Sequence, residues 1–468
     1  MSRKAELTIK FLVIGGGIAG LACAIALRRV GHRVVVLEQY SDIDISKMSH
    51  GGIRLPPNVS KVLFHWGLER ALRQVSITSS AIEVKIYETG EFIGKHYWKE
   101  EALRETGGDF LFLHACIISS PRITLISSFH PACQSPASTT AVSVSGDGPR
   151  VTLTTGETLL ADVIVGADGH SSIVQQAIVG KDVIDAAPYQ SLFYNTTVPG
   201  ALMRADPQLA PFFKQPVETT FVWLGNNRSA VAFRMGGKDE FALHLWVRPM
   251  QKGLSDDDCW GGGLELKDMR RQLGECEPKL LKITKLAATP ACVQVKMVPP
   301  IEDWVDEHGR MVIIGEAAHP LPAGSLQGGA MAVEDAAVFA KLFSHLRNRD
   351  QISTFLHAFQ DLREDRCASV MHTEQCNLYF QMMPAGPRQE QCNQEMRART
   401  AQGESVFGIS EASEQWEQLK DLWGYDADNE VDDWWVKWGL LRERAKQRSI
   451  AMETEMNTAR LRSLYMRA

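Results

Sequence analysis

The feature that most constrains the fold is a glycine-rich segment near the start of the sequence, FLVIGGGIAGLACAIALRRVGHRVVVLEQ. The apolar run at 11–14 predicts a strand, the alanine- and leucine-rich stretch up to Arg29 predicts a helix, and 34–37 predicts a second strand that ends at Glu38. This order is typical of a βαβ unit. Three glycines in GxGxxG spacing connect the first strand with the helix: Gly15, Gly17 and Gly20.

Each of these glycines has a separate physical role in such a unit. Gly15 permits a tight turn, Gly17 lets the backbone approach a pyrophosphate at the helix N-terminus, and Gly20 lets helix and strand pack closely. Glu38, about 18 residues after the last of them, can accept hydrogen bonds from a ribose. A plain glycine-rich turn is the competing interpretation, but the complete unit favours a dinucleotide site. The motif leaves open whether the dinucleotide is NAD or FAD.

Composition limits the class of protein. A chain of 468 residues is too long for one ordinary core, and its 44% hydrophobic content suffices for roughly two to three domains. The formal net charge of -6 gives no reason to expect a nucleic-acid partner, and the basic cluster at 442–448 is interpreted as a solvated helix face. Nine cysteines without a CxxC pair or zinc spacing predict reduced thiols, no metal site and a cytoplasmic protein. No apolar run reaches about 18 residues, so no membrane span is expected.

Three further motifs follow the βαβ unit. The stretch HGGIRLPPNVSKVLFHWGL places Gly51, Gly52 and two prolines before an amphipathic helix. The stretch GETLLADVIVGADGHSSIV contains a strand that ends in GADG at 166–169, which on its own could be a simple turn. The stretch VIIGEAAHPLPAGSLQGGA is an apolar strand that ends at a glycine and a carboxylate before an irregular loop. A buried strand that ends in such a loop is a common ligand site in α/β proteins.

In their order and approximate spacing, these motifs resemble those of the class A flavoprotein aromatic hydroxylases, in particular their salicylate-hydroxylase-like fungal members. The matching landmarks extend from about residue 11 to about residue 340. The resemblance implies an α/β fold with a three-layer, Rossmann-like FAD-binding domain, an inserted antiparallel-sheet substrate domain and a C-terminal helical extension. We expect the FAD-binding domain at 1–185 and 301–383, the substrate sheet at 186–300 and the extension at 384–468.

The resemblance also assigns residues to the site. It implies that Glu316 binds the flavin ribitol, and that a helix beginning at 327–330 points amides at the flavin pyrimidine edge, where a helix N-terminus stabilises negative charge. Pro320 would lie beside the ring system, and His319 would be a structural hydrogen-bonding residue rather than a catalytic base. The expected FAD-binding residues are Gly15, Gly17, Gly20, Glu38, Gly51, Gly52, Asp168, Gly169, Gly315, Glu316, Gly328 and Gly329.

Two departures from the family pattern bear on FAD binding. The family usually has aspartate at Glu316, and losing the hydrogen bond of that carboxylate would cost about 0.5–1.5 kcal/mol. Where the family usually has a His-Arg pair whose arginine reaches the FAD phosphates, this chain has Ala115 after His114. Arg122 is the candidate substitute. Losing such a charge-assisted contact would cost about 1.5–3 kcal/mol, so the sequence predicts that FAD retention could be weak.

The middle of the chain, at about 186–299, alternates apolar and polar residues in TTFVWLG, SAVAFRM and FALHLWVRP. This alternation predicts strands of an antiparallel sheet with one covered face. In the family a sheet of this kind covers the substrate, and Phe233 stands at roughly the position of a pocket aromatic. On physical grounds alone, an aromatic residue in such a strand is more often core than pocket. Trp223, His244 and Trp246 carry the same ambiguity.

The region beyond Ala330 has apolar residues at helical spacing, which predicts helices that pack on the FAD domain. The tail contains Trp434, Trp435 and Trp438, whose spacing places two of them on one helical face. We expect this face to dock on the body of the protein, with a partner as the alternative.

The resemblance implies an enzyme: an FAD-dependent monooxygenase of secondary metabolism. It would use NADPH or NADH and O2 to hydroxylate an aromatic or polyketide-like small molecule through a flavin hydroperoxide. Arg54 is the candidate for a catalytic charge near the flavin or the nicotinamide cofactor, with a surface arginine as the alternative, and Pro320 is the second catalytic candidate. Two other functions stay open: a flavin-dependent dehydrogenase or oxidase, and a catalytically impaired flavin-binding module, which Ala115 and Glu316 suggest. The sequence leaves the substrate and the oligomeric state undetermined.

Overall fold

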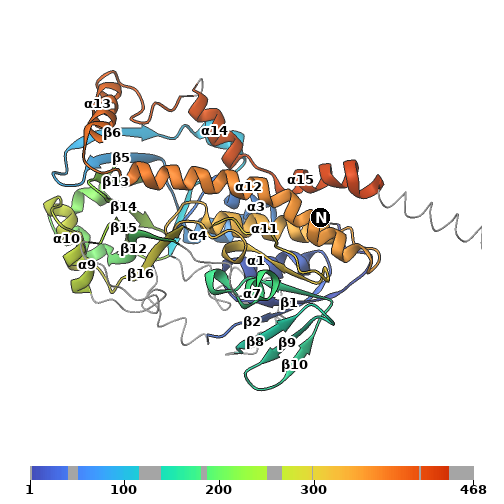
Figure 1. The fold of residues 1–468 in the computed structure, drawn as a ribbon. Coiled ribbons are helices and arrows are strands. Elements are labelled where there is room, and N and C mark those ends of the chain that lie inside the picture. The colour runs from blue at the N-terminus through green and yellow to red at the C-terminus, as the bar shows by residue number, and fades with distance from the viewer. Residues whose placement is uncertain are drawn as a thin grey trace, which may run out of the picture. The chain divides into compact units, whose positions relative to one another are not determined.

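The computed structural model of the chain describes residues 3–40, 51–114, 139–180, 187–249, 266–297, 299–410 and 413–441. Ala115, Arg122 and the basic cluster at 442–448 lie outside these ranges. The chain divides into two compact units, Met1–Tyr425 and Asp426–Ala468. The predicted site residues all belong to the first unit, whose elements are labelled in Figure 1.

A four-stranded parallel sheet, in the order β17-β11-β1-β2, forms the base of the first unit. Its strands are β1 (Lys10–Ile14), β2 (Arg33–Leu37), β11 (Val163–Gly166) and β17 (Met311–Ile313). Phe11 of β1 pairs with Val163 on one side and Val34 on the other. The strands are nearly continuous apolar runs because both faces of the sheet are covered. The predicted βαβ unit is confirmed, with α1 (Ile18–Arg29) as its helix.

Two long helices connect this sheet with the rest of the unit. Helix α11 (Gly328–Phe343) packs against α1, and the ring of Phe11 lies 5.1 Å from the ring of Phe343. Helix α12 (Gln351–Gln381) runs along α11 and continues to the larger sheet of the unit (Figure 1). Shorter helices complete the layer: α3 (Pro57–His65), α4 (Glu69–Val75), α5 (Glu100–Thr106) and α7 (Ile173–Val179).

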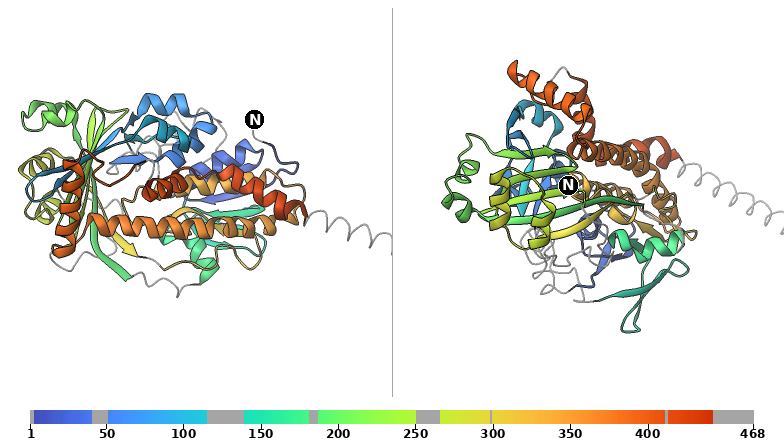
Figure 2. Two further views of the ribbon diagram at one scale, coloured as in Figure 1. Left: turned by 90° about the horizontal axis from the view of Figure 1, so that it is seen from above. Right: turned by 60° about the vertical axis from the view of Figure 1, so that its left-hand side comes forward.

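The larger sheet has seven strands in the order β16-β12-β15-β14-β13-β5-β6. They are β5 (Ala81–Ile86), β6 (Phe92–Tyr97), β12 (Ala187–Pro199), β13 (Thr219–Gly225), β14 (Arg228–Met235), β15 (Glu240–Val247) and β16 (Ala291–Met297). All neighbouring strands are antiparallel except β13 and β5. One face packs against α8 (Gly200–Ala205), α9 (Leu266–Gln272) and α10 (Pro278–Leu286), as Figure 2 shows from two sides.

The predicted fold class is confirmed: a Rossmann-like parallel core, a large mainly antiparallel sheet and helices towards the C-terminal end. The sheet expected at 186–300 also takes in β5 and β6, which come from the first segment of the chain. These two strands extend it because β5 pairs with β13 over six residues from Ala81 to Ile86. The three domain boundaries drawn from the sequence stay a prediction.

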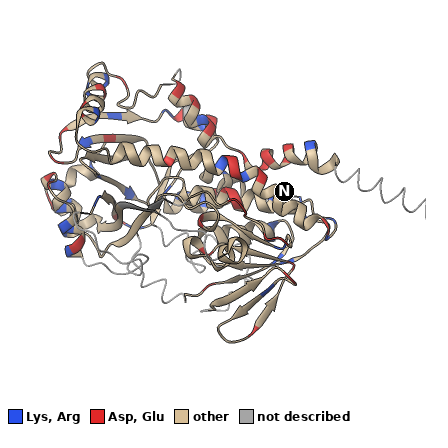
Figure 3. Ribbon diagram, viewed as in Figure 1, with Lys and Arg blue, Asp and Glu red and all other residues tan. Residues whose placement is uncertain are grey.

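Two small sheets and two further helices complete the first unit. Strands β3 (Gly52–Leu55), β7 (Leu111–His114) and β4 (Ile77–Thr78) form one sheet, and β8 (Ala141–Ser145), β9 (Arg150–Leu153) and β10 (Thr158–Leu160) form the other. Helices α13 (Pro387–Ala401) and α14 (Glu414–Trp423) follow α12. Acidic and basic residues are interspersed on α9, α12 and α13 (Figure 3). Within the described ranges, no helix is both long and apolar enough to cross a membrane.

The second unit contains α15 (Ala427–Trp434) and a π-helical turn, Trp435–Gly439. The carboxylate of Asp426 caps α15, because it accepts hydrogen bonds from the amides of Asp428 and Asn429. Trp438 leaves 62% of its surface exposed. That the tryptophans dock on another surface stays a prediction.

Candidate cofactor and substrate site

The N-terminus of α1 has accessible backbone amides that could bind a ligand. Gly15 has a φ of 102°, which favours glycine, and a Cβ on Gly20 would overlap the carbonyl oxygen of Gly15. A Cβ on Gly17, the N-cap residue, would meet no described atom within 4 Å. The first amides of α1 therefore face open space, with the positive end of the helix dipole behind them.

Glu38 lies at the end of β2, beside the glycine turn. Its carboxylate accepts hydrogen bonds from the amide of Gly16, at 2.7 Å, and from the amide of Tyr40, at 2.8 Å. These two bonds fix the carboxylate next to α1. Because an ionised carboxylate has about four acceptor positions, it can still bind ribose hydroxyls.

Asp168, Gly169 and Glu316 come together where two neighbouring parallel strands, β11 and β17, end. The carboxylate of Asp168 accepts hydrogen bonds from Ser172 Oγ, at 2.5 Å, and from the Ile173 amide, at 2.8 Å, so it holds the start of α7. A Cβ on Gly169 would lie 3.9 Å from Glu316 Oε2. The side chain of Glu316 is exposed, yet the surrounding protein removes enough water to raise its pKa, against the effect of His319. This carboxylate is therefore accessible at the carboxyl end of β17.

The N-terminus of α11 approaches that of α1. A Cβ on Gly329 would lie 3.6 Å from the Cδ1 atoms of Ile18 and Ile53, and the first turn of α11 contains no acidic residue. Gly315 has a φ of 61° and donates its amide to Asp335 Oδ2 at 2.8 Å. The loop between β17 and α11 is thus tied to the helix that follows it.

Gly51 and Gly52 have a packing role that the resemblance did not imply. A Cβ on Gly51 would overlap the side chain of Asn195, and a Cβ on Gly52 would lie 2.5 Å from the Cβ of Ala242. The Gly52 carbonyl accepts hydrogen bonds from Asn195 Nδ2, at 3.2 Å, and His244 Nε2, at 3.0 Å. These glycines are needed because β3 packs directly on the large sheet. That they contact FAD as well stays a prediction.

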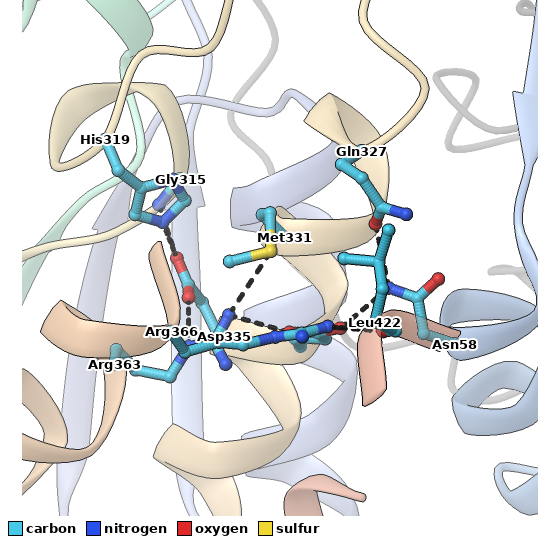
Figure 4. A network of polar contacts seen from close by, with 10 residues as sticks. Asn58, Gly315, His319, Gln327, Met331, Asp335, Arg363, Arg366 and Leu422 are labelled. Atoms are coloured by element: carbon cyan, nitrogen blue, oxygen red, sulfur yellow. Dashed lines mark hydrogen bonds and ion pairs between the residues drawn. The ribbon is translucent and has the colours of Figure 1, made fainter. Parts of the chain in front are cut away.

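A buried network of charges holds the start of α11 and the loop before it (Figure 4). Arg363 donates to Asp335 at 2.8 Å and to Glu334 at 2.9 Å, and Arg366 donates to Glu334 at 2.9 Å. Asn58 donates to Glu334 at 2.7 Å. Arg363, Glu334 and Asp335 are completely buried.

His319 belongs to this network, since its Nε2 lies 2.6 Å from Asp335 Oδ2. Burial would raise the pKa of Asp335, but His319 and Arg363 outweigh it and hold that pKa at about 2. The pKa of His319 is correspondingly raised well above its ordinary value, because Asp335 outweighs the effect of burial. The geometry agrees with the structural role predicted for His319.

Arg54 is partly buried on β3 and donates from Nη2 to the carbonyl oxygen of Gly324 at 2.8 Å. Burial lowers its pKa to about 10, with Glu374 acting in the opposite direction. Pro320 stands at the start of the same loop, one residue after His319, and is also partly buried. The interpretation of Arg54 as a surface arginine is therefore wrong, because its guanidinium is held inside the first unit.

Phe233 is completely buried on β14, with its ring 4.7 Å from that of Phe112 and 5.2 Å from that of His244. Trp223 lies in the core on the other face of the sheet, where its Nε1 donates to Glu277. Trp246 donates from Nε1 to the carbonyl oxygen of Ala323 at 3.0 Å. The structure gives Phe233 a packing role, and its contact with a substrate stays a prediction.

Comparisons with known proteins agree with this geometry. A family described as "FAD dependent oxidoreductase" matches residues 10–111. The FAD-dependent monooxygenase OpS4 of Beauveria bassiana (strain ARSEF 2860) is 26% identical over 428 residues, which cover 90% of this chain and 95% of the relative. The structure of CtdE in complex with FAD and a substrate has a TM-score of 0.72 at 17% identity, covering 93% of this chain and 100% of the other. A salicylate hydroxylase substrate complex has a TM-score of 0.70 at 18% identity, covering 91% and 97%.

Over most of its length the chain is similar to class A FAD-dependent monooxygenases. Of the two dinucleotides that the glycine motif left open, FAD is the one that this family binds. The residues of the monooxygenase fit FAD: the open N-terminus of α1 offers amides for a diphosphate, and the carboxylates of Glu38 and Glu316 offer acceptors for hydroxyl groups. These groups are distributed along the carboxyl edge of the parallel sheet, where α/β folds bind their ligands.

Of the two departures from the family pattern, at Glu316 and at Ala115, the structure describes only the first. The exposed carboxylate of Glu316 has a longer side chain than aspartate, and it points to open space beside Gly169. His114 is buried on β7, with its Nε2 3.4 Å from Glu240 Oε2. Ala115 and its candidate substitute Arg122 lie outside the described residues, so the predicted loss of a phosphate contact stays a prediction.

Sequence reasoning missed Glu374 of α12, which is 5% exposed. It accepts hydrogen bonds from the amides of Leu326, at 3.3 Å, and Gln327, at 3.2 Å, just before α11 begins. Burial raises the pKa of Glu374 to about 7, against the effects of Arg54 and of these two amides. The available signal was its spacing: Glu374 stands four residues from each of two buried apolar residues of α12, Val370 and Leu378, so a carboxylate occupies the core stripe of the helix.

Proposed function

We propose that this class A monooxygenase uses NAD(P)H and O2 to hydroxylate an aromatic or polyketide-like small molecule. One observation carries the proposal: the open N-terminus of α1, Glu38 and Glu316 all lie along the carboxyl edge of the parallel sheet, in a unit that also contains a large, mainly antiparallel sheet. The relatives support the reaction class, because one is named an FAD-dependent monooxygenase and another a salicylate hydroxylase. The oxygen intermediate expected from the resemblance stays a prediction.

When bound, FAD would supply the chemistry that passes electrons from NAD(P)H to O2. The protein would bind and orient the cofactor with α1, Glu38 and Glu316. The first turn of α11, at Gly328 and Gly329, would stabilise negative charge near the reacting groups through its dipole and its free amides. The remaining predicted FAD contacts, at Asp168, Gly169, Gly315, Gly51 and Gly52, would shape the walls of the site.

Arg54 and Pro320 are proposed to act in catalysis. Arg54 would place a positive charge near the reacting ring, since Gly324 and the rest of its loop hold the guanidinium in place. The variant Arg54→Ala should slow the reduction of the flavin without abolishing FAD binding. Unchanged kinetics of reduction would remove Arg54 from the mechanism.

The first experiment is a visible absorption spectrum of the purified protein, with and without added FAD, followed by NADPH or NADH in the same cuvette. We expect a bound flavin spectrum that the reduced nicotinamide bleaches, and a panel of phenolic compounds should include some that accelerate bleaching. A protein that binds no flavin in excess FAD would overturn the proposal.

The same samples separate the two alternative functions. A monooxygenase transfers one atom of labelled O2 to its product. A dehydrogenase or oxidase would turn over without that label, and a flavin-binding module would keep its flavin spectrum without substrate-stimulated oxidation of NADPH.

A further inference from the structure

A cavity of about 120 Å³ is lined on one side by the loop that precedes α11. We refer to it as the Arg54–Glu374 pocket. Its walls come from four parts of the first unit: β3, β15, the loop at 322–326 and α12. The residues that matter below are Arg54, Trp246, Gly324, Glu374, Asn377 and Gln381.

Arg54 supplies hydrogen-bond donors to this pocket. One of its Nη atoms is held by the carbonyl oxygen of Gly324. Among the described residues its other N–H groups have no recorded hydrogen bond, and the guanidinium lies close enough to Glu374 for each to shift the pKa of the other. The bond to Gly324 therefore fixes the position of the Arg54 guanidinium, and its other N–H groups can still donate to a ligand.

Glu374 supplies an acceptor opposite these donors. Its two backbone partners, Leu326 and Gln327, fix the carboxylate at the wall, and no side chain of the described residues makes a hydrogen bond to it. A buried carboxylate with so few partners has a high desolvation cost, which is why burial raises its pKa to about 7. A ligand that donates a hydrogen bond to Glu374 would reduce this cost.

Two amide side chains of α12 complete the polar wall. Asn377 is exposed, so the pocket opens to solvent at this end of the helix. Gln381 Oε1 is buried without a hydrogen-bond partner among the described residues. A buried amide oxygen without a partner is a second group that a ligand could satisfy.

We propose that the Arg54–Glu374 pocket binds one end of the substrate, and that this end is an uncharged group with a hydrogen-bond acceptor beside a donor, such as a carboxamide or a hydroxy-carbonyl. Arg54 would donate to the acceptor, and Glu374 would accept from the donor. A carboxylate would fit less well, because its second oxygen would face Glu374. The proposal rests on the proposed function, since it assigns a substrate class to the same site.

The size and the position of the pocket support a role at one end of a larger molecule. A cavity of about 150 Å³ holds one benzene molecule, so this pocket can hold a functional group with part of a ring. Its wall at 322–326 belongs to the loop that connects Pro320 with Gly328, and therefore with the N-terminus of α11. A bound group would lie beside the residues that are proposed to act on the substrate.

The test uses two probes of the same shape, benzamide and benzoate, with the full-length protein in excess FAD. Their dissociation constants would be measured by ligand-observed NMR titration between pH 5.5 and 8.5. At pH 8 we expect benzamide to bind about tenfold more tightly than benzoate, a difference that corresponds to one hydrogen-bonding interaction. Equal binding of the two probes, or no binding of either at millimolar concentration, would overturn the proposal.

The variant Glu374→Gln removes the charge and keeps the shape. In it, benzoate should bind about tenfold more tightly than in the wild-type protein at pH 8, with benzamide changed by less than about threefold. The matched control is Glu364→Gln, at an exposed position of the same helix, which should leave both dissociation constants unchanged. A benzoate affinity that Glu374→Gln leaves unchanged would contradict the proposal.

The pH profile separates recognition from a merely structural role. In the wild-type protein, benzoate should bind more weakly as pH rises through about 7, because Glu374 loses its proton there. Arg54 is the charged group that faces Glu374 among the described residues, and it stays protonated across this range. His244 stays neutral, since burial and Arg54 lower its pKa to about 3. The benzoate profile should be flat in Glu374→Gln.

Two outcomes keep this proposal distinct from the proposed function. Selection of benzamide by a protein that NADPH does not reduce would support the pocket and overturn the monooxygenase. If Glu374→Gln weakens NADPH binding and leaves both probes unchanged, the pocket serves the carboxamide of the nicotinamide cofactor and the substrate proposal is wrong.

Discussion

Helix α12 carries residues of two buried sets of charges, and the two sets are balanced in opposite ways. At one set, Arg363 and Arg366 satisfy Glu334 and Asp335, and the pKa of Asp335 is held at about 2. At the other, Glu374 has two backbone amides and Arg54 as its partners among the described residues, and burial raises its pKa to about 7. Both carboxylates are buried, so the difference comes from the number and the distance of their partners. The balanced set holds the loop before α11, whereas the unbalanced one is the set that we propose to bind a ligand.

The largest effect is expected from breaking the balanced set. The variant Asp335→Asn leaves Arg363 with one carboxylate and weakens the hold on Gly315 and His319. Removing one partner of a buried ion pair typically costs about 3–5 kcal/mol, and we expect a loss of this size in the free energy of unfolding. Urea titration measures it. The control Asp361→Asn, at an exposed position of α12, should change it by less than about 0.5 kcal/mol, and a loss below about 1 kcal/mol in Asp335→Asn would contradict the interpretation.

A smaller effect of opposite sign is expected at Glu374. The pKa of Glu374 is raised by folding, so its protonated form stabilises the protein at low pH, and this contribution is lost as pH rises from about 4.5 to about 7. At pH 8 we expect Glu374→Gln to be more stable than the wild-type protein by roughly 1–3 kcal/mol, with little difference at pH 4.5. Urea titrations at several pH values would show this. A difference that does not change with pH would mean that Glu374 is well paired.

The contribution of Asp335 has the reverse pH dependence. Because folding lowers the pKa of Asp335, its contribution is present above about pH 4 and is lost as pH falls towards 2. Asp335 also raises the pKa of His319, and the stability from that shift is present below about pH 6.5 and is lost as pH rises. The cost of Asp335→Asn should therefore be larger at pH 5 than at pH 8. The pH dependence of the free energy of unfolding in Asp335→Asn and Glu374→Gln therefore distinguishes the two sets of charges.

The variant Arg54→Gln tests the Glu374 set from the side of its cation, and we expect a still smaller change in the free energy of unfolding. Without the guanidinium, the charged form of Glu374 loses its one described cation, so the pKa of Glu374 should rise further. We expect the variant to lose about 1 kcal/mol at pH 8 and less at pH 5. Urea titration at the two pH values checks this, and equal losses at both would show that Arg54 acts only through its bond to Gly324.

The smallest effect on stability is expected at the α1 N-terminus, the proposed FAD diphosphate site, where backbone amides rather than charged side chains would contact the ligand. Gly17→Ala should change the free energy of unfolding by less than about 0.5 kcal/mol, because its Cβ meets no described atom, and should weaken FAD binding about tenfold. Flavin fluorescence titration measures the binding. Gly20→Ala is the contrast: its Cβ overlaps the Gly15 carbonyl oxygen, so it should cost about 1–3 kcal/mol.

The parts of the fold that the sequence predicted are those with a local pattern. The βαβ unit, three strands of the large sheet (β13, β14 and β15) and the helices after Ala330 follow from the spacing of apolar residues and from glycine positions. The pairing of β5 with β13 was missed because two strands distant in sequence leave no local signal of their contact.

The same reason explains which site residues were missed. Glu38 and Glu316 follow strands whose carboxyl ends share one edge, so their placement on the same edge could be expected. Arg54 and Glu374 meet only because α12 crosses to the large sheet, which no motif indicates. Gly51 and Gly52 were assigned to FAD, although the close approach of Asn195 and Ala242 already explains why they are glycines.

The entry of β5 and β6 into the large sheet limits how this enzyme could be recombined with its relatives. The sheet is assembled from separate stretches of chain, and β5 forms its contact with β13 only when both are present. A chimera that took only 187–297 from a relative would combine five strands of the relative with β5 and β6 of this chain. A chimera that is meant to exchange the whole sheet would therefore have to exchange the hairpin at 81–97 together with 187–297.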